Sequence, residues 1–147
     1  MWSFFHKLGS SPWLYRIGGA LLRWLLPLSL LALGTGLVWG LLFTAPDFRQ
    51  GNSYRIIYIH VPASVVALAG YYVMALAGAI SLIWKMKMAD IAMRATAPVG
   101  AALTFIALVT GSIWGKPTWG TWWVWDARIT SMLILLFLYL GVIALYE

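Results

Sequence analysis

The sequence predicts an all-α, polytopic membrane protein with four transmembrane helices and a tryptophan-rich outer segment that forms a loop and a short interfacial helix. Composition is the first reason: 63% of the 147 residues are hydrophobic, only 10% are charged, and the mean hydropathy is +0.87, unlike soluble globular domains. The second reason is that the apolar residues form four runs of about the length that crosses a bilayer core of roughly 30 Å. We therefore expect one integral membrane domain over residues 1–147.

The first predicted span covers residues 24–43, which carry no charge and match the length of a transmembrane helix. The preceding segment, residues 1–23, combines aromatic side chains with three cations: Lys7, Arg16 and Arg23. This combination indicates an amphipathic lead-in at the membrane surface. Because it lacks the short apolar core and cleavage site of a signal peptide, we expect an uncleaved span. Gly36 and Gly40 are spaced for a close helix contact, without further function.

A polar segment at 44–55 precedes the second apolar run, which covers 56–84. This run exceeds the length of one crossing, and counting about twenty residues back from its end places the span at 65–84. His60 is then expected at the outer edge of the bilayer, one or two residues before the membrane helix. Pro62 fits the first turn of that helix, where a missing N–H is harmless.

The basic segment 85–94 leads into a third charge-free span at 95–114, and the fourth apolar run covers 129–145. The sequence stops at Glu147 without the basic flank that often follows a span. From this stop we expect that the membrane domain is truncated at its C-terminus.

The distribution of Lys and Arg orients these spans, because cytoplasmic segments carry the excess of positive charge. The N-terminal segment and the second loop hold six: Lys7, Arg16, Arg23, Lys85, Lys87 and Arg94. The first and third loops hold four: Arg49, Arg55, Lys116 and Arg128. This bias predicts a cytoplasmic N-terminus. It also predicts that the segment before His60 and the tryptophan-rich segment lie together on the outer face.

Several classes of function are excluded by what the sequence lacks. The net charge of +6 in so apolar a chain indicates topology and contact with membrane lipid, and no nucleic-acid motif is present. The chain has no cysteine, which excludes a disulfide framework, a thiolate metal site and a CxxCH attachment motif. No Ser/His/Asp set, paired carboxylates or P-loop pattern is present, so we expect neither an enzyme nor an ATPase subunit.

Residues 114–128 hold five of the chain's ten tryptophans: Trp114, Trp119, Trp122, Trp123 and Trp125. Gly115, Pro117 and Gly120 are expected to break the helix that arrives from the third span. From Thr121 onward no breaker remains, so a second helix is expected to begin there.

On a helical wheel four residues of this segment lie on one face, at i, i+3, i+4 and i+7: Trp119, Trp122, Trp123 and Asp126. The result would be a flat aromatic surface that ends in a carboxylate, with Arg128 behind it. One interpretation is an aromatic belt at the membrane–water interface. The other is a platform for a large, flat, apolar ligand, because stacked rings contribute about 0.5–1.5 kcal/mol per pair beyond area burial.

A histidine at the membrane surface is compatible with a water-satisfied residue, a pH switch or a metal ligand. His6 lies on the opposite side by this topology, so no two-histidine zinc site is expected. A single imidazole beside a large aromatic surface suits an iron porphyrin above other cofactors, with His60 as the iron ligand and the tryptophans over the macrocycle. Arg55 or Arg128 would pair with the propionates, the alternative being lipid phosphate.

Asp126 is one of only four acids in the chain. One interpretation is a surface ion pair with Arg128 or Lys116, which contributes about 0–1 kcal/mol. The other is that Asp126 orients a tryptophan N–H or a basic group on a partner protein.

The motif W-G-x-x-x-W-G-T-W-W-V-W-D-A-R at 114–128 resembles the tryptophan-rich motif of a family of haem-handling membrane proteins. The resemblance extends over essentially the whole chain and includes G-N-S-Y-R-I-I-Y-I-H-V-P around His60. The N-terminal half resembles the haem exporter protein C (CcmC) members of that family in particular.

This resemblance implies a six-span protein of the bacterial inner membrane, of which this chain would contain four spans. It implies non-covalent, transient binding of haem b at the periplasmic face and delivery to the haem chaperone CcmE during cytochrome c maturation. The partners it implies are the ABC transporter subunits CcmA and CcmB and the small subunit CcmD.

By the same resemblance, His60 matches the family's first axial histidine. The positions that match its motif are Trp119, Trp122, Trp123, Trp125 and Asp126. The family's second axial histidine belongs to a later outer loop, beyond Glu147. Met132, one turn into the fourth helix, is not expected to face the site, so the chain is expected to supply one axial ligand.

A permease that moves haem through its own helices is the competing hypothesis. Ionisable groups inside spans are costly and are retained for function, and the four predicted spans contain none. Handling of haem at the outer surface is therefore favoured.

Overall fold

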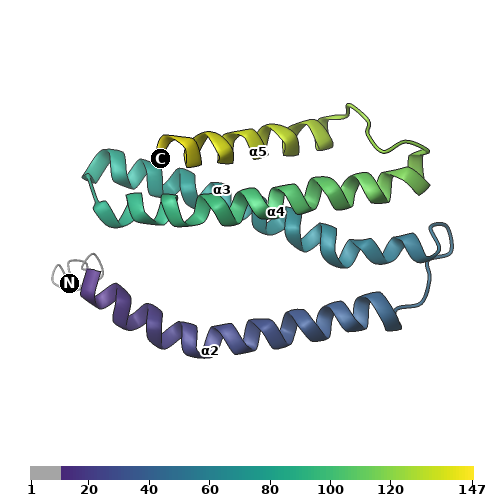
Figure 1. Ribbon diagram of the computed structural model, residues 1–147, viewed down its shortest axis with the longest axis horizontal. Helices are drawn as coiled ribbons and strands as arrows, with labels where there is room; N and C mark the ends of the chain where they lie inside the picture. Colours follow the sequence, from purple (N-terminus) through teal and green to yellow (C-terminus); the bar gives the residue numbers. More distant parts are fainter. Residues whose placement is uncertain (1–10) are drawn as a thin grey trace.

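The computed structural model describes residues 11–147, and in that part of the chain it contains helices and no strand (Figure 1). In chain order the elements are α2 (Ser11–Val38), a π-helical turn η1 (Trp39–Phe43), a 3₁₀ turn η2 (Asn52–Ile56), α3 (Ile57–Trp84), α4 (Lys87–Trp119) and α5 (Ala127–Leu145). Four helices are long and apolar enough to cross a membrane. The predicted fold class and the predicted number of spans are confirmed.

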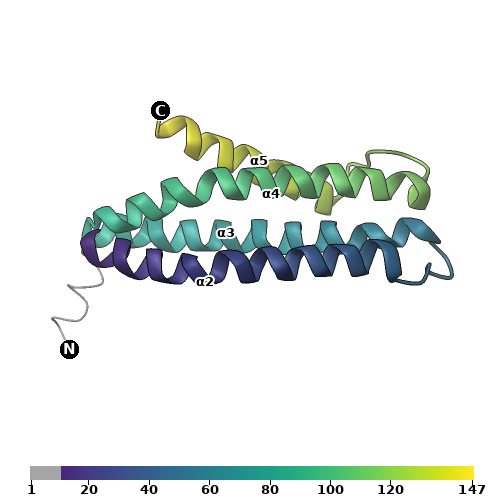
Figure 2. The same cartoon turned by 60° about the horizontal axis from the view of Figure 1, so that its bottom comes forward.

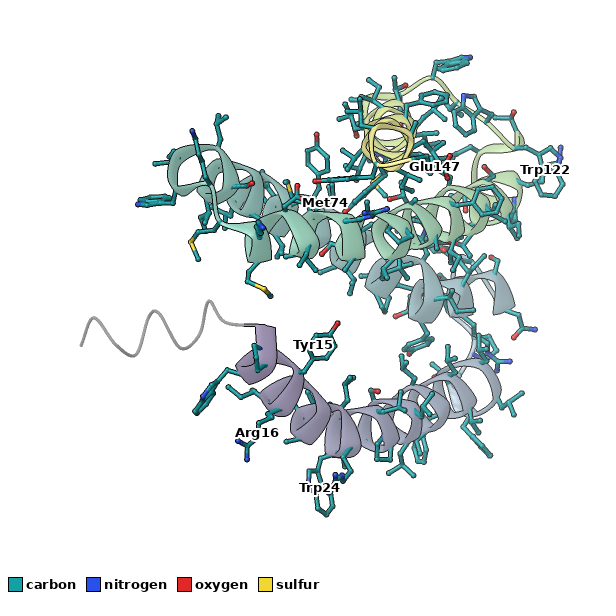
Figure 3. All side chains as sticks on the ribbon, turned by 60° about the vertical axis from the view of Figure 1, so that its left-hand side comes forward. Tyr15, Arg16, Trp24, Met74, Trp122 and Glu147 are labelled. Atoms are coloured by element: carbon teal, nitrogen blue, oxygen red, sulfur yellow. The ribbon has the colours of Figure 1, made fainter. Side chains whose placement is uncertain are left out.

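The helices form a bundle of three, α3, α4 and α5, with α2 standing apart along most of its length (Figures 1 and 3). Figure 2 shows the same bundle from another side. Trp24 in α2 points away from the other helices (Figure 3) and is 71% exposed. α2 meets the rest at its far end, where a Cβ at Gly40 would lie 2.5 Å from the Tyr58 ring. The predicted close helix contact is therefore found at Gly40, whereas Gly36 has nothing within 4 Å.

The core of the bundle is built on small residues that let α3 and α4 approach closely. The buried small residues on these two helices are Ala63, Ala67, Ala77, Ala89, Ala97, Gly100, Ala101 and Ala107. Tyr139 from α5 is completely buried against them, and its hydroxyl donates a 2.7 Å hydrogen bond to the Ala67 carbonyl. A Cβ at Gly100 would overlap the Tyr139 ring. Close packing here fixes how the three helices sit together.

The helices begin earlier than the hydropathy of the sequence predicted. α2 begins at Ser11, so residues 12–23 of the predicted lead-in belong to the same continuous helix as the first span. Pro12 lies in the first turn of α2, where proline is tolerated. Residues 1–10, including His6 and Lys7, lie outside the described part of the chain. Hydropathy marks the residues that lie inside the hydrocarbon core of the bilayer. A helix can extend beyond that core, and its end is set by the next turn in the chain.

The same reason explains the starts of the next two helices. η2 leads directly into α3, so His60 lies in the first turn of α3, and the prediction that it precedes the helix was wrong. The predicted loop at 85–94 shrinks to Lys85 and Met86, with Lys85 in the left-handed conformation at φ 54°. Lys87 is already helical.

The prediction that Gly115 and Pro117 break the third helix was also wrong. α4 continues through both to Trp119 and ends at Gly120, whose φ of 77° suits glycine. Residues 121–126 are not helical, and α5 begins after Asp126. The expected helix from Thr121 is therefore absent, and its tryptophans do not share a helical face.

The two connections that carry the candidate residues lie at one end of the bundle. The α2–α3 and α4–α5 connections are at the right in Figures 1 and 2, whereas the α3–α4 turn and the C-terminus are at the left. The prediction that these connections share a face is confirmed. We call this end of the bundle the tryptophan end.

Replacing Gly100 with Ala is expected to destabilise the protein by about 1–3 kcal/mol, because the added methyl overpacks the Tyr139 ring. Gly141→Ala is the matched control on α5, since a Cβ there meets nothing within 4 Å and alanine favours the helix. Thermal unfolding in detergent measures both. Equal midpoints for the two variants would contradict the packing described above.

Candidate functional site

A pocket of about 510 Å³ opens between α3, α4 and α5 at the tryptophan end. Its lining residues are Gln50, His60, Ser64, Leu68, Ala107, Leu108, Gly111, Trp114, Thr118, Trp119, Arg128, Ile129, Ser131 and Met132. Leu68 and Leu108 lie about two helical turns further from the tryptophan end than His60 and Trp114. The lining is therefore polar and aromatic toward the tryptophan end, which we call the mouth of the pocket, and aliphatic further from that end, which we call its depth.

One face of α4 forms a seat for the His60 imidazole. Its Nδ1 lies 3.0 Å from the Ala107 carbonyl oxygen and 3.1 Å from the Thr110 hydroxyl. A Cβ at Gly111 would lie only 3.0 Å from His60 Cε1, so the absence of a side chain there makes room for the ring. Trp114 follows on the same face of the helix. The four α4 residues are spaced i, i+3, i+4 and i+7.

These contacts determine which imidazole nitrogen is free. A carbonyl oxygen only accepts, so Nδ1 carries the proton that it donates to Ala107. The Thr110 hydroxyl donates its own proton to the Ile106 carbonyl at 2.7 Å and can accept from the same N–H. Nε2 has no hydrogen-bond partner among residues 11–147. Its lone pair is available to a metal, as in histidine ligands oriented by a backbone carbonyl.

Trp114 packs edge-on against His60, with ring centroids 5.8 Å apart and an interplanar angle of 72°. Its indole N–H donates a 2.7 Å hydrogen bond to Gln50 Oε1. Gln50, from the α2–α3 connection, was not identified from the sequence. The sequence offered one indication of its role: Gln50 lies in the polar segment 44–55, which was predicted on the same side of the membrane as the tryptophan-rich segment. The spacing of residues within that segment does not distinguish Gln50 from its neighbours.

Trp119 and Arg128 also line the pocket, and they contact each other. The Arg128 guanidinium lies 5.3 Å from the centre of the Trp119 ring and forms an ion pair with Asp126 at 2.7 Å. The structure thus contains the ion pair between Asp126 and Arg128 that the first interpretation predicted. Asp126 also caps α5 by accepting the Ile129 N–H at 2.9 Å, and it accepts no tryptophan N–H from residues 11–147.

The remaining three tryptophans of the motif lie outside the pocket. Trp122 points outward from the tryptophan end (Figure 3) and is 57% exposed, with Lys116 Nζ 6.0 Å from its ring centre. Trp123 and Trp125 meet edge to face at 5.4 Å. The Trp123 indole N–H is buried without a hydrogen-bond partner among the described residues. No flat stacked platform exists here, because residues 121–126 are not helical.

Arg55 does not line the pocket either, since its guanidinium donates two hydrogen bonds to the Thr44 carbonyl, at 3.1 and 2.7 Å. Met132, expected to face away, does line it. Within residues 11–147 no group of three or more His, Cys, Asp or Glu side chains is arranged to hold a metal ion. The predicted residues that the pocket brings together are His60, Trp114, Trp119 and Arg128.

The chain is similar to a known protein family and to several named relatives. Residues 4–147 match the family model described as CcmC, heme exporter protein C. Heme exporter protein C of Escherichia coli (strain K12) is 58% identical over 147 residues, which are all of this chain and 60% of the relative. The proteins of the same name from Haemophilus influenzae and Paracoccus denitrificans are 52% and 48% identical, over 60% and 54% of their lengths. The chain thus spans about 60% or less of these relatives.

Replacing Asp126 with Ala is expected to fray the first turn of α5, because the acceptor for the Ile129 N–H is lost. Asp126→Asn is the matched control, since its amide oxygen can still cap the helix. Hydrogen exchange of the amides of residues 127–130 measures the effect. Equal protection in the Ala variant and the wild type would contradict the capping role.

The cap is also expected to depend on pH. The Ile129 N–H and the Arg128 guanidinium lower the pKa of Asp126 below its ordinary value. A carboxyl whose pKa is lowered on folding contributes its full stability above the unfolded-state pKa and loses it as the pH falls through the folded-state pKa. Protection of α5 should therefore decline on acidification in the wild type and not in Asp126→Asn.

Proposed function

This chain belongs to the heme exporter protein C (CcmC) family, and on that premise we propose that it binds haem b, non-covalently and transiently, in the pocket between α3, α4 and α5. The main observation behind this proposal is the position of the His60 imidazole against α4, where Nδ1 contacts the Ala107 carbonyl oxygen and the Thr110 hydroxyl. An imidazole that lines a largely apolar pocket, is held by a backbone carbonyl at Nδ1 and has an unpaired Nε2 is suited to be an iron ligand.

The pocket matches a porphyrin in size and chemistry. Its volume of about 510 Å³ lies within the range of small-molecule sites. The aliphatic depth suits the macrocycle and the aromatic mouth offers ring contacts. Arg128 at the mouth is placed to pair with a carboxylate, in exchange for its present contact with Asp126.

We further propose that the tryptophan end faces the periplasm, with the protein in the inner membrane and the start of the chain in the cytoplasm, as the Lys and Arg distribution predicts. The relatives' printed name supports a part in haem export. In the wider assembly the ABC transporter subunits CcmA and CcmB and the small subunit CcmD would be its partners. Its role is binding and transfer, without catalysis of a reaction.

Delivery of haem to the chaperone CcmE needs a surface that another protein can reach. Trp122 and Trp125 are exposed by 57% and 73% at the tryptophan end, and tryptophan is the residue most enriched at the energetic centres of interfaces. We assign these two side chains to contact with the chaperone, and Trp119 to the haem itself.

A permease route through the helices has less support. The fully buried polar side chain among the described residues is Thr104, which donates to the Gly100 carbonyl within its own helix. A porphyrin dianion moving through the bundle would meet no ionisable partner in mid-membrane. Binding at the surface is therefore the function that the site supports best.

His60→Ala is expected to lower haem retention by at least about tenfold, since it removes the one directional bond to iron. His60→Gly supplied with free imidazole is the matched rescue, because the added base can occupy the vacated seat. Haem content and the Soret band of the detergent-purified protein report the outcome. An unchanged Soret position in His60→Ala would exclude His60 as the ligand.

Trp119→Ala and Trp122→Ala are expected to separate binding from transfer. Trp119 lines the pocket, so its loss should lower haem retention. Trp122 points outward, so its loss should leave retention within about twofold while slowing transfer to purified CcmE. If Trp122→Ala lowers retention as strongly as Trp119→Ala, the division of roles is wrong.

A further inference from the structure

A second, smaller pocket of about 310 Å³ lies directly beside the first. Its lining residues are Arg49, Gln50, Ser53, Pro117 and Thr118. Two of them, Gln50 and Thr118, also line the first pocket, so the two spaces are neighbours that share a wall. A polar arm on a ligand in the first pocket would therefore lie close to the second.

A tight turn in the α2–α3 connection presents Arg49 and Gln50. The Asp47 carboxylate accepts the backbone N–H groups of both residues at 2.8 Å, and Asp47 and Gly51 exchange backbone hydrogen bonds of 3.1 and 2.9 Å. Gly51 has a φ of 57°, which glycine adopts without strain. The turn is thus closed by its own hydrogen bonds, and its side chains are left for other contacts.

The hydrogen bonds around the second pocket show which donors are unused. Gln50 Oε1 accepts the Trp114 indole N–H, so the Gln50 amide nitrogen keeps both of its N–H donors. The Ser53 and Thr118 hydroxyls already donate to the carbonyls of Gln50 and Trp114. The Arg49 guanidinium forms no hydrogen bond or ion pair with any residue in 11–147.

The unused donors at this pocket suit an anion. Asp47 is the acid of the same turn. The backbone N–H groups of Gln50 and Arg49 lower its pKa, and the Arg49 charge lowers it further. Its carboxylate oxygen is engaged by the turn and does not form an ion pair with Arg49. Among the lining residues, the Arg49 guanidinium and the Gln50 amide NH₂ keep unused donors, a set that matches a carboxylate.

We propose that this second pocket binds a carboxylate arm of the ligand whose apolar body occupies the first pocket. The proposal rests on the proposed binding of haem and assigns one propionate to Arg49 and the Gln50 amide. It replaces Arg55, whose guanidinium is occupied by the Thr44 carbonyl. Gln50 then acts twice, holding Trp114 against His60 with its oxygen and the carboxylate with its nitrogen.

The test compares haem with haem dimethyl ester, in which both carboxylates are neutralised and the macrocycle is unchanged. Arg49→Gln is expected to weaken haem binding by about three- to tenfold, the range for a charge-assisted hydrogen bond at a partly exposed site. It should change binding of the diester by less than about twofold. Arg16→Gln removes the same charge from an exposed site on α2 and should change neither.

Gln50→Glu is the sharper second variant. It preserves an oxygen for the Trp114 N–H but replaces the NH₂ donor with a carboxylate oxygen, which repels a propionate. Haem binding should fall by a larger factor than diester binding, and an equal fall for both ligands would contradict the carboxylate assignment. Metal-free protoporphyrin should show the same dependence on Arg49, because the arm does not involve iron.

The outcomes separate this inference from the proposed function. Wild-type protein that binds neither haem nor its diester would refute the haem site itself, and the propionate assignment with it. Wild-type protein that binds both, with an Arg49→Gln effect equal for haem and diester or absent from both, would overturn the carboxylate pocket alone.

Discussion

The site depends on one hydrogen bond between two helices, from His60 Nδ1 in α3 to the Ala107 carbonyl in α4. Small residues make that bond possible: with Ala107 buried and no side chain at Gly111, the ring fits against the α4 backbone. The bond fixes the tautomer and leaves Nε2 free. Trp114, on the same face, covers the ring edge and is itself held by Gln50. The proposed ligand atom, Nε2, is thereby held in place by the protein alone.

The length of α4 is the second constraint. Because the helix continues through Gly115 and Pro117 to Trp119, Trp114 and Trp119 reach the pocket from a rigid element. The non-helical residues 121–126 then hold the other tryptophans outside it. The tryptophan-rich motif thus has two parts. Trp114 and Trp119 line the pocket, whereas Trp122, Trp123 and Trp125 lie outside it. The proposed separation of haem binding from haem transfer rests on this division.

The sequence predicted the fold class, the four spans and the shared end of the two connections, because hydropathy and charge follow directly from the membrane environment. It misplaced helix ends, since charged residues such as Lys87 extend a helix beyond the hydrocarbon. It assigned Arg55 to the site, overlooked Gln50, and predicted that Met132 faces away from the pocket that it lines. Which side chain faces a pocket depends on helix rotation and on competing hydrogen bonds, such as that of Arg55 to a backbone carbonyl, and neither appears in residue spacing.

The most direct test locates the bound porphyrin among the methionine methyl groups. In ¹³C-methyl-methionine protein, one equivalent of ferric haem should broaden the Met132 resonance beyond detection, because Met132 lines the pocket and unpaired iron electrons relax nearby nuclei. Met86 and Met93, at the start of α4 toward the opposite end, should stay sharp. Diamagnetic zinc protoporphyrin should leave all the signals visible. A Met132 signal unchanged by bound ferric haem would contradict the site between α3, α4 and α5.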